Sequence, residues 1–259
     1  MKLSGHTLLI TGGTSGIGLA LARRLVAAGS TVIVCGRSAA KLAALQVSDP
    51  QLRTYACDVG LEADRVRLFT EATRDFPALN ILFNNAGMQL FPALDGTAGW
   101  EGVKAEIATN LEAPIHLAML FAAHLARQPN AAILNTTSGL AHVPLAVAPV
   151  YSATKAALHS FTLSLRHQFR DKPIRVIEVS PPHVETDLGA PGANQAGMNL
   201  DAYADSVMQG LRDDVLEITT GFSTLAAQGT RADRDKFFRE VNSRITQGKT
   251  TAAVPAPAQ

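Results

Sequence analysis

Short apolar runs alternate with longer helical patterns along most of the chain, and this alternation constrains the fold more than any other feature. The runs lie at 7–10, 31–35, 53–59, 80–85, 131–136 and 174–180. They show no alternation of apolar and polar residues, which is typical of strands buried on both faces of a parallel sheet. The helical patterns between them lie near 17–28, 38–46, 62–75, 98–127 and 150–170. The sequence therefore predicts an α/β fold with a doubly wound parallel sheet of about seven strands and helices on both faces.

Two further segments complete the predicted organisation. The helix near 98–127 contains Pro114, so we expect a kink or break between Asn110 and Pro114. Beyond the sixth strand, residues 201–247 read as two helices, with 216–222 as the last strand. We expect a single domain over residues 1–249 with a mobile substrate loop near 187–200, and a disordered tail at 250–259.

Composition and charge exclude several classes of function. The chain has 259 residues, of which 47% are hydrophobic and 17% charged, as expected for a globular protein. A formal net charge of +1 argues against nucleic acid or an anionic membrane surface as a partner. No apolar run approaches the roughly 18 residues of a membrane span, and no signal peptide is evident. We therefore expect a cytoplasmic protein.

The metal-binding residue types are scattered along the sequence. Cys35 and Cys57 show neither metal-ligand spacing nor a disulfide framework, and we expect reduced thiols. His159 and His167 lie two turns apart on one predicted helix, without an acid or cysteine nearby in sequence, and are expected at a surface or interface. The sequence predicts no metal site.

The stretch TGGTSGIG (11–18) follows the first predicted strand and opens a helix. Its glycines allow a tight turn and a close approach of the backbone to a pyrophosphate, whose charge meets the free N–H groups of the helix start. This context predicts a dinucleotide site on a Rossmann-type sheet. The site residues predicted within the stretch are Gly12, Thr14, Ser15, Gly16, Ile17 and Gly18.

The residues after the second predicted strand favour one dinucleotide over the other. An acidic residue there would bind the ribose diol of NAD, but the chain has Arg37 and Ser38 and no acid. A guanidinium and a hydroxyl suit a 2′-phosphate. We therefore expect NADP(H) to be preferred over NAD(H).

Further motifs follow in order: Asp58 in CDV, NNAG at 84–87, Asn110 in ATNLEAP, Ser138, and YSATK at 151–155. With these motifs the chain resembles the short-chain dehydrogenase/reductase family from Thr7 to about Val215. TGGTSGIG, GR after the second strand and PPHVET make it most similar to the bacterial group named after D-alanine esterification proteins. The resemblance implies cofactor contacts at Asp58, Val59, Asn85, Ala86, Gly87, Pro181, Val184 and Thr186.

Two of these positions leave alternatives open. Family members carry a PG-x-V-x-T segment beside the nicotinamide, and here Pro182 replaces the glycine, which removes a backbone N–H and fixes φ. Asp58 could equally cap a helix over residues 60–75.

YSATK places Tyr151 and Lys155 four residues apart, on one face of a predicted helix. The resemblance implies that Tyr151 is the general acid or base, that Ser138 binds the substrate oxygen, and that Lys155 binds the nicotinamide ribose. Lys155, together with the positive oxidised nicotinamide, should also lower the phenol pKa from its usual value of about 10. The resemblance further implies that Asn110 holds a water that links Lys155 to solvent.

These residues predict an NADP-dependent carbonyl reductase or alcohol dehydrogenase for a small hydrophobic ketone or aldehyde. The expected substrate pocket consists of Leu140, His142, Val143, Leu145 and Leu188. Two alternatives stay open: a cofactor-sensing regulator without turnover, and an imine reductase with the same machinery. The resemblance and the wide apolar faces of the helices near 98–127 and 150–170 predict a homodimer or homotetramer.

Overall fold

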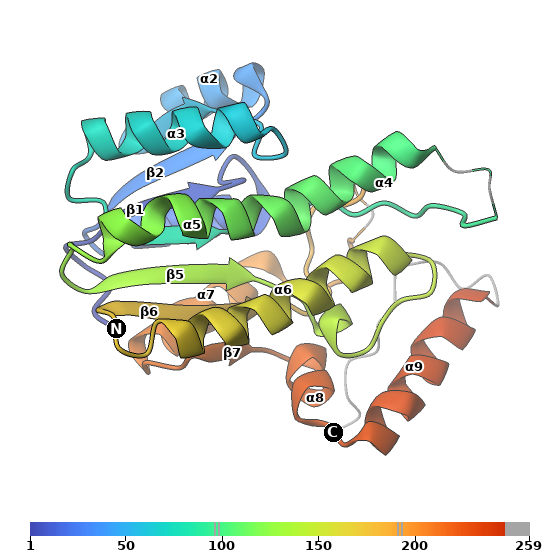
Figure 1. Cartoon of the computed structure of the whole chain (residues 1–259). Helices are drawn as coiled ribbons and strands as arrows, with labels where there is room; N and C mark the ends of the chain where they lie inside the picture. The colour runs from blue at the N-terminus through green and yellow to red at the C-terminus, as the bar shows by residue number, and fades with distance from the viewer. Residues whose placement is uncertain (96, 98, 191, 193, 247–259) are drawn as a thin grey trace.

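Seven parallel strands form one sheet in the order β3-β2-β1-β4-β5-β6-β7 (Figure 1). The computed structural model describes residues 1–246 except 96, 98, 191 and 193, so the tail expected to be disordered lies outside the described residues. The strands are β1 (Thr7–Thr11), β2 (Thr31–Gly36), β3 (Arg53–Ala56), β4 (Ile81–Asn84), β5 (Ala131–Thr136), β6 (Ile174–Ser180) and β7 (Glu217–Thr219).

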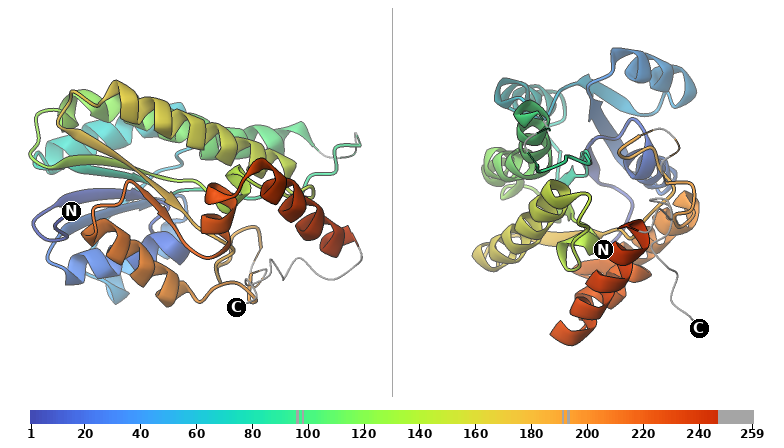
Figure 2. Two further views of the ribbon diagram at one scale, coloured as in Figure 1. Left: turned by 90° about the horizontal axis from the view of Figure 1, so that it is seen from below. Right: turned by 90° about the vertical axis from the view of Figure 1, so that its right-hand side faces the viewer.

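Helices cover both faces of this sheet, as the strand–helix alternation predicted (Figures 1 and 2). Side chains of α1, α2 and α7 pack in one core cluster, and those of α3, α5 and α6 in another on the opposite face. The helices are α1 (Gly16–Ala27), α2 (Ala39–Ser48), α3 (Glu62–Asp75), α4 (Trp100–Ile107), α5 (Ala113–Leu125), α6 (Pro149–Gln168), α7 (Leu200–Arg212), α8 (Phe222–Gln228) and α9 (Arg231–Thr246).

The strand order reverses between β1 and β4, which pair directly with each other. In doubly wound sheets, ligands bind beyond the carboxyl ends of the strands at such a reversal. The TGGTSGIG stretch follows β1, and NNAG begins at Asn84, the last residue of β4. The topology thus brings these two motifs to the same edge of the sheet.

The helix predicted near 98–127 is interrupted where the proline was expected to break it. A short π-helical segment at Ala108–Glu112 separates α4 from α5. Pro114 has no N–H to donate to the carbonyl of Asn110 four residues earlier, so the regular ladder cannot continue there. The interruption confirms the predicted break.

The C-terminal region differs from the prediction. Three helices follow β6 instead of two, because Gly221 takes a left-handed φ of 57° and turns the chain from β7 directly into α8. The aromatic ring of Phe237 in α9 packs against Phe222 in α8 with ring centroids 5.9 Å apart. The last strand is consequently shorter than 216–222, and β3 likewise ends at Ala56 instead of residue 59.

None of the helices in the described part of the chain combines the length and the apolar character needed to cross a membrane.

Candidate active site

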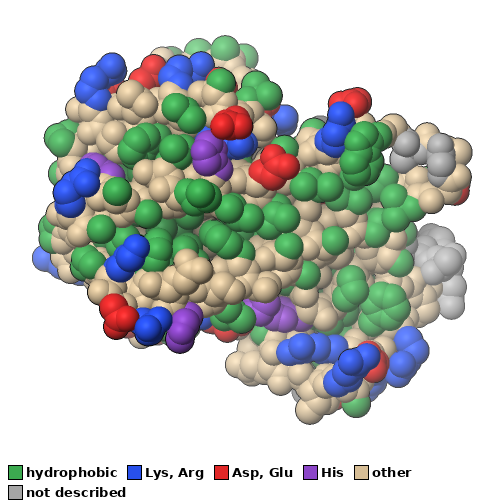
Figure 3. Space-filling view, in the orientation of Figure 1, with side chains coloured by type: hydrophobic (Ala, Val, Ile, Leu, Met, Phe, Trp, Pro, Cys, Tyr) green, Lys and Arg blue, Asp and Glu red, His purple; other side chains and the backbone are tan. Residues whose placement is uncertain are grey.

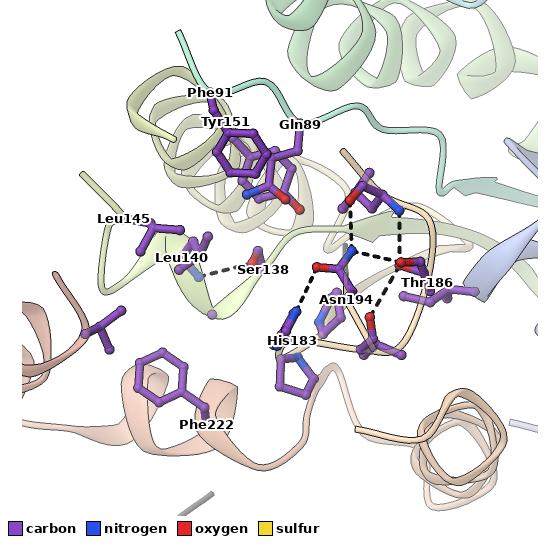
Figure 4. Close-up of a pocket in the computed structure, with 17 residues that line it drawn as sticks. Gln89, Phe91, Ser138, Leu140, Leu145, Tyr151, His183, Thr186, Asn194 and Phe222 are labelled. Carbon is purple, nitrogen blue, oxygen red and sulfur yellow. Dashed lines mark hydrogen bonds between the residues drawn. The ribbon is translucent and has the colours of Figure 1, made fainter. Parts of the chain in front are cut away.

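Two adjoining hollows lie at the carboxyl edge of the sheet. The larger is a cleft of about 500 Å³, and the smaller is a mostly apolar cavity of about 130 Å³, shown in Figure 4. The residues that border both are Ile17, Gln89, Tyr151, Pro181, Thr186 and Leu188. A molecule bound in the cleft and a second molecule bound in the cavity would therefore meet beside these six residues.

The cleft gathers all but one of the residues predicted to contact the cofactor. They are Gly12, Thr14, Ser15, Gly16, Ile17, Gly18, Arg37, Ser38, Asp58, Val59, Asn85, Ala86, Gly87, Tyr151, Lys155, Pro181 and Thr186. Val184 is the exception, because it lines the apolar cavity instead.

The glycine-rich turn is locked against NNAG. Thr11 Oγ1 accepts hydrogen bonds of 3.0 Å from the backbone N–H groups of Asn85 and Ala86. Gly12 has a left-handed φ of 65°, and a Cβ there would lie 2.8 Å from the Cα of Ala86. A Cβ on Gly18 would lie 2.4 Å from Nδ2 of Asn85. The lack of a side chain at Gly18 therefore leaves room for the Asn85 side chain. The sequence had predicted Gly18 only for the close approach of a phosphate.

The start of α1 faces the cleft with unused donors. Ser15 is the N-cap residue, and its side chain makes no capping hydrogen bond. No acidic side chain lies in the first turn. The free N–H groups and the positive end of the helix dipole therefore form an anion-binding position.

Positive charge lies at the end of β2. Arg37, Ser38 and Lys41 all line the cleft. The Ser38 hydroxyl oxygen accepts from the backbone N–H of Lys41 at 3.2 Å and caps α2. The Arg37 side chain is 65% exposed, and its Nη1 lies 4.0 Å from Oδ2 of Asp58. Lys41 was not among the predicted site residues, although a lysine in the first turn of the helix after the second strand was a usable signal.

Asp58 does not cap a helix. Its Oδ1 accepts from the backbone N–H of Gly60 at 2.9 Å, and α3 begins only at Glu62 with Leu61 as its N-cap residue. The carboxylate therefore stabilises a turn beside the cleft, and the capping alternative was wrong.

Ser138, Tyr151 and Lys155 meet where the two hollows join. Ser138 lines the cavity, Lys155 lines the cleft, and Tyr151 lines both. Tyr151 is 5% exposed and Lys155 only 2%. Nζ of Lys155 donates to the carbonyl oxygen of Thr136 at 2.7 Å. Ser138 Oγ accepts from the backbone N–H of Leu140 at 3.1 Å, which leaves its own hydroxyl hydrogen free to donate.

Burial shifts both titratable groups of this site toward their neutral forms. It raises the pKa of Tyr151 to about 12, against a lowering effect of the hydrogen bond with Ser138. It lowers the pKa of Lys155 to about 8. The expected lowering of the phenol pKa by Lys155 is thus not seen in the protein alone. Desolvation is the largest effect on the phenol, and Nζ of Lys155 donates its hydrogen bond to the carbonyl oxygen of Thr136.

Asn110 holds a loop and borders neither hollow. Its Oδ1 accepts from the backbone N–H of Met88 at 2.9 Å, and its Nδ2 donates to the carbonyl oxygen of Met88 at 2.8 Å. These two bonds fix the chain that leaves NNAG. The side chain is thereby occupied, so the predicted water would have to bind the backbone carbonyl of Asn110, to which Pro114 cannot donate a hydrogen bond.

Glu106 is a buried acid that the sequence analysis missed. It has no exposed surface, and its Oε1 accepts from the backbone N–H of Leu90 at 3.1 Å. Its Oε2 has no hydrogen-bond partner within the described chain. Burial raises the pKa of Glu106, and the charge of Lys155 opposes this. In the sequence, the feature that could have pointed to Glu106 is its position one helical turn before Asn110.

The apolar cavity departs from the predicted pocket at two positions. Leu140, Leu145 and Leu188 line it. Val143 does not, because it is fully buried in a core cluster. His142 does not either, because its ring packs against His159 with centroids 4.6 Å apart. The lining residues that the sequence analysis missed include Gln89, His183, Asn194, Phe222 and Val241.

The segment after β6 folds over the cavity (Figure 4). The ring of His183 bonds to Oδ1 of Asn194 through Nε2 at 2.7 Å. Nδ2 of Asn194 donates to the carbonyl oxygens of Thr186 and Leu188. Asn194 thus ties both arms of the predicted substrate loop together, although sequence alone marked this stretch only as mobile.

The proline pair joins this segment to the Ser138 loop. The carbonyl oxygen of Pro181 accepts from the backbone N–H of Gly139 at 3.1 Å. Pro182, which replaces a glycine of the family pattern, lines the cavity. The carbonyl oxygen of Pro181 therefore holds the segment against the loop. This contact does not need a backbone N–H at position 182, where Pro182 has none.

Known proteins resemble this chain over most of its length. A family profile described as "short chain dehydrogenase" matches residues 6–196. The uncharacterized oxidoreductase DltE of Bacillus subtilis is 45% identical over 251 residues, which cover 94% of this chain and 99% of the relative. Serine 3-dehydrogenase of Agrobacterium fabrum is 34% identical over 192 residues, or 73% of this chain and 77% of that protein.

Solved structures share the fold. A short-chain dehydrogenase from Burkholderia cenocepacia in complex with NADP has a TM-score of 0.79 at 24% identity, covering 93% of this chain and 99% of that one. A metagenomic short-chain oxidoreductase in complex with NADP has a TM-score of 0.71 at 26% identity, covering 85% and 98%. With the profile match and the identity to DltE, these likenesses show that the chain is an oxidoreductase of the short-chain dehydrogenase/reductase family, of the D-alanine-esterification type.

Proposed function

We propose that the protein reduces a hydrophobic ketone or aldehyde with NADPH and, in reverse, oxidises a secondary alcohol. The observation that carries this proposal is the position of Tyr151, which borders both the cleft and the cavity. A group there can reach a carbonyl in the cavity while lying against a nucleotide in the cleft. Ser138 on one side and Lys155 on the other supply the remaining parts of an acid–base site.

The cleft fits a nicotinamide dinucleotide. Gly12 has no side chain that could occupy the turn, and the start of α1 offers unused backbone donors for a pyrophosphate. Lys155, already buried at the cleft, would bind the nicotinamide ribose. The bound cofactor supplies the hydride.

The protein's own groups handle the oxygen of the substrate. The Ser138 hydroxyl donates a hydrogen bond to the carbonyl oxygen and polarises it. Tyr151 donates its proton to the alkoxide as negative charge develops there, and a pKa of about 12 keeps this phenol protonated at neutral pH. In the oxidation direction, the phenolate of Tyr151 accepts the alcohol proton. Lys155 and the oxidised nicotinamide, both positive, would favour that phenolate.

We infer that NADP(H) is preferred over NAD(H). Arg37, Ser38 and Lys41 present a guanidinium, a hydroxyl and an ammonium at the cleft where the adenine ribose would lie. Three such groups match the charge and the acceptors of a 2′-phosphate. Structural relatives occur in complex with NADP and with NADH, so the assignment depends on these three side chains.

The cavity favours an apolar substrate. Leu140, Leu145, Phe91 and Phe222 contribute to its lining, and no described lining residue is Arg, Lys, Asp or Glu. A charged metabolite would lose hydration there without gaining a partner. Gln89 and the His183–Asn194 pair are the polar groups that could orient the substrate.

The deciding experiment follows nicotinamide absorbance with purified protein, NADPH and NADH in parallel, and a panel of aromatic and aliphatic ketones and aldehydes. We expect oxidation of NADPH with at least one hydrophobic carbonyl. Cyclic imines are assayed in the same way, and turnover of these alone would assign the protein as an imine reductase. Tight NADPH binding with no turnover of any compound would point to a cofactor sensor or to a substrate outside the panel.

We also propose a homodimer or homotetramer in the cytoplasm. Met119 on α5 is 70% exposed and Leu163 on α6 is 43% exposed. Figure 3 shows hydrophobic side chains gathered on the face that these two helices form. Burial of that face in a second copy would remove this apolar surface from water. The proposed location in the cytoplasm agrees with Cys35 and Cys57, which are both free cysteines, as is usual in a reducing compartment. Sedimentation equilibrium of the purified chain tests the oligomer.

A further inference from the structure

Four side chains from separate parts of the fold converge behind the loop that carries Ser138. His142 directly follows the short 3₁₀ turn at 139–141, His159 lies in α6, Glu178 in β6 and Glu217 in β7. One possible ligand atom from each of these four lies within 4.8 Å of the others. Because the four residues are far apart in sequence, their spacing gave no sign of a site.

The chemistry of this group is that of a metal site. Nε2 of His142 is buried and has no hydrogen-bond partner within the described chain. Leaving a buried polar atom unpaired costs about 1–3 kcal/mol, so a ligand that used this nitrogen would recover that free energy. Both carboxylate oxygens of Glu178 lie 2.9 Å from Nδ1 of His159. Carboxylates that bind a metal ion are themselves commonly held by hydrogen bonds, as the Glu178 carboxylate is here.

We propose that His142, His159, Glu178 and Glu217 bind one divalent transition-metal ion, with Zn²⁺ as the best match. Imidazole nitrogen and carboxylate oxygen are ordinary zinc ligands at about 2.0–2.2 Å. Ligand atoms at that distance from a tetrahedral ion lie about 3.4 Å apart, so no pair here has to draw together by more than roughly 1.4 Å. His142, His159 and Glu217 are each partly exposed and can turn inward, whereas Glu178 is fixed with no exposed surface.

Such an ion would be structural. None of the four residues lines the cleft or the cavity, so the ion would not touch substrate or nucleotide. Glu178 Oε1 accepts from the hydroxyl of Thr137 at 2.6 Å, next to Ser138. The ion would therefore clamp the Ser138 loop to α6, β6 and β7 from behind. The proposal does not depend on the reaction that the protein catalyses.

The test measures Zn²⁺ binding to the full chain after chelator treatment and removal of any affinity tag. Competition with a chromophoric chelator should give one ion per chain, and Mg²⁺ at the same concentration should not compete. Substitution of Co²⁺ should give visible absorption typical of four-coordinate nitrogen and oxygen ligands. We expect His142→Ala and Glu217→Gln each to weaken Zn²⁺ binding at least about tenfold, the order found when the groups supporting a metal site are removed.

His167→Ala is the matched control, because His167 lies on the same helix as His159 and is exposed. It should leave Zn²⁺ affinity unchanged. Glu217→Gln alters a partly exposed side chain, so its melting curve in metal-free buffer should match that of the parent protein. Zn²⁺ affinity equal in the parent and in the doubly substituted His142→Ala, Glu217→Gln protein would show a hydrogen-bonded network only and overturn the proposal.

Discussion

Nζ of Lys155 lies 5.6 Å from the centroid of the Tyr151 ring, while its hydrogen bond goes to the carbonyl oxygen of Thr136. The buried carboxylate of Glu106 raises the pKa of both groups, although burial is the larger effect on each. Burial and the Glu106 charge thus both favour the protonated phenol of Tyr151, whereas on Lys155 the Glu106 charge opposes the effect of burial.

This arrangement predicts the pH dependence of turnover. We expect reduction to need the Lys155 ammonium, because it would stabilise the phenolate that Tyr151 becomes when it gives up its proton. The pKa of Lys155 is about 8, so kcat/KM for reduction should fall above about pH 8. Glu106→Gln removes the charge that raises the pKa of Lys155, so the fall should move to lower pH. The same substitution should lower the pKa of Tyr151, so the rise of the oxidation rate should also move to lower pH.

The measurement is kcat/KM against pH in both directions for the parent and the variant. Glu101→Gln is the matched control, because Glu101 lies on the same helix with its side chain 87% exposed. Gln at position 106 keeps an acceptor for the backbone N–H of Leu90. Identical profiles for the parent and Glu106→Gln would show that Glu106 has no electrostatic influence on the site.

Tyr151→Phe removes the proposed acid and leaves the ring in place. We expect kcat to fall by about 10²–10⁴-fold, the range typical of lost general acid catalysis. NADPH affinity, measured by fluorescence titration, should change little. Tyr55→Phe is the control, because that hydroxyl donates to Asp75 at the surface, away from both hollows. A Tyr151→Phe variant with a tenth or more of the parent kcat would contradict the assigned role.

Arg37→Ala tests the cofactor preference. A charge-assisted hydrogen bond contributes about 1.5–3 kcal/mol, and the 65% exposure of Arg37 places it at the lower end. We expect about tenfold weaker NADPH binding and little change for NADH, both measured by isothermal titration. Arg53→Ala alters an exposed arginine outside the cleft and should affect neither. Equal losses for the two cofactors would refute the 2′-phosphate assignment.

Motifs that are contiguous in sequence could be predicted, because each follows a strand whose place in the sheet the alternation fixes. The turn at 11–18, NNAG, and the pair Tyr151 and Lys155 all reach the expected edge of the sheet. Pro114 likewise revealed the break between α4 and α5, because a missing N–H acts locally.

Features that depend on contacts across the fold could not be predicted. Glu106 becomes a buried partner of the site only because α4 packs against α6. His142 looked like a pocket residue beside Ser138, but the turn at 139–141 directs it toward His159. The pKa of Tyr151 depends on burial, which the spacing of Tyr151 and Lys155 does not reveal.

Gly18→Ala tests the contact between the phosphate turn and NNAG. The added Cβ would lie 2.4 Å from Nδ2 of Asn85 and 2.7 Å from the carbonyl oxygen of Gly12, so the turn must shift. Overpacking of this kind costs about 1–3 kcal/mol, which corresponds to a Tm lower by several degrees in a chain of this size. NADPH affinity should fall as well. Gly99→Ala should change neither, because no described atom lies within 4 Å of a Cβ there.

Leu140→Ala tests whether the apolar cavity is the substrate pocket. Leu140 lines the cavity next to the Ser138 loop, so its truncation enlarges the space beside the proposed reaction centre. Each added or removed methylene in a hydrophobic pocket is worth about 1–3 kcal/mol. The ratio of kcat/KM for a bulky aryl ketone over a small aliphatic ketone should therefore rise about tenfold or more. Leu163→Ala removes an exposed leucine from α6 and should leave that ratio unchanged. If Leu140→Ala also left it unchanged, the substrate would have to bind outside this cavity.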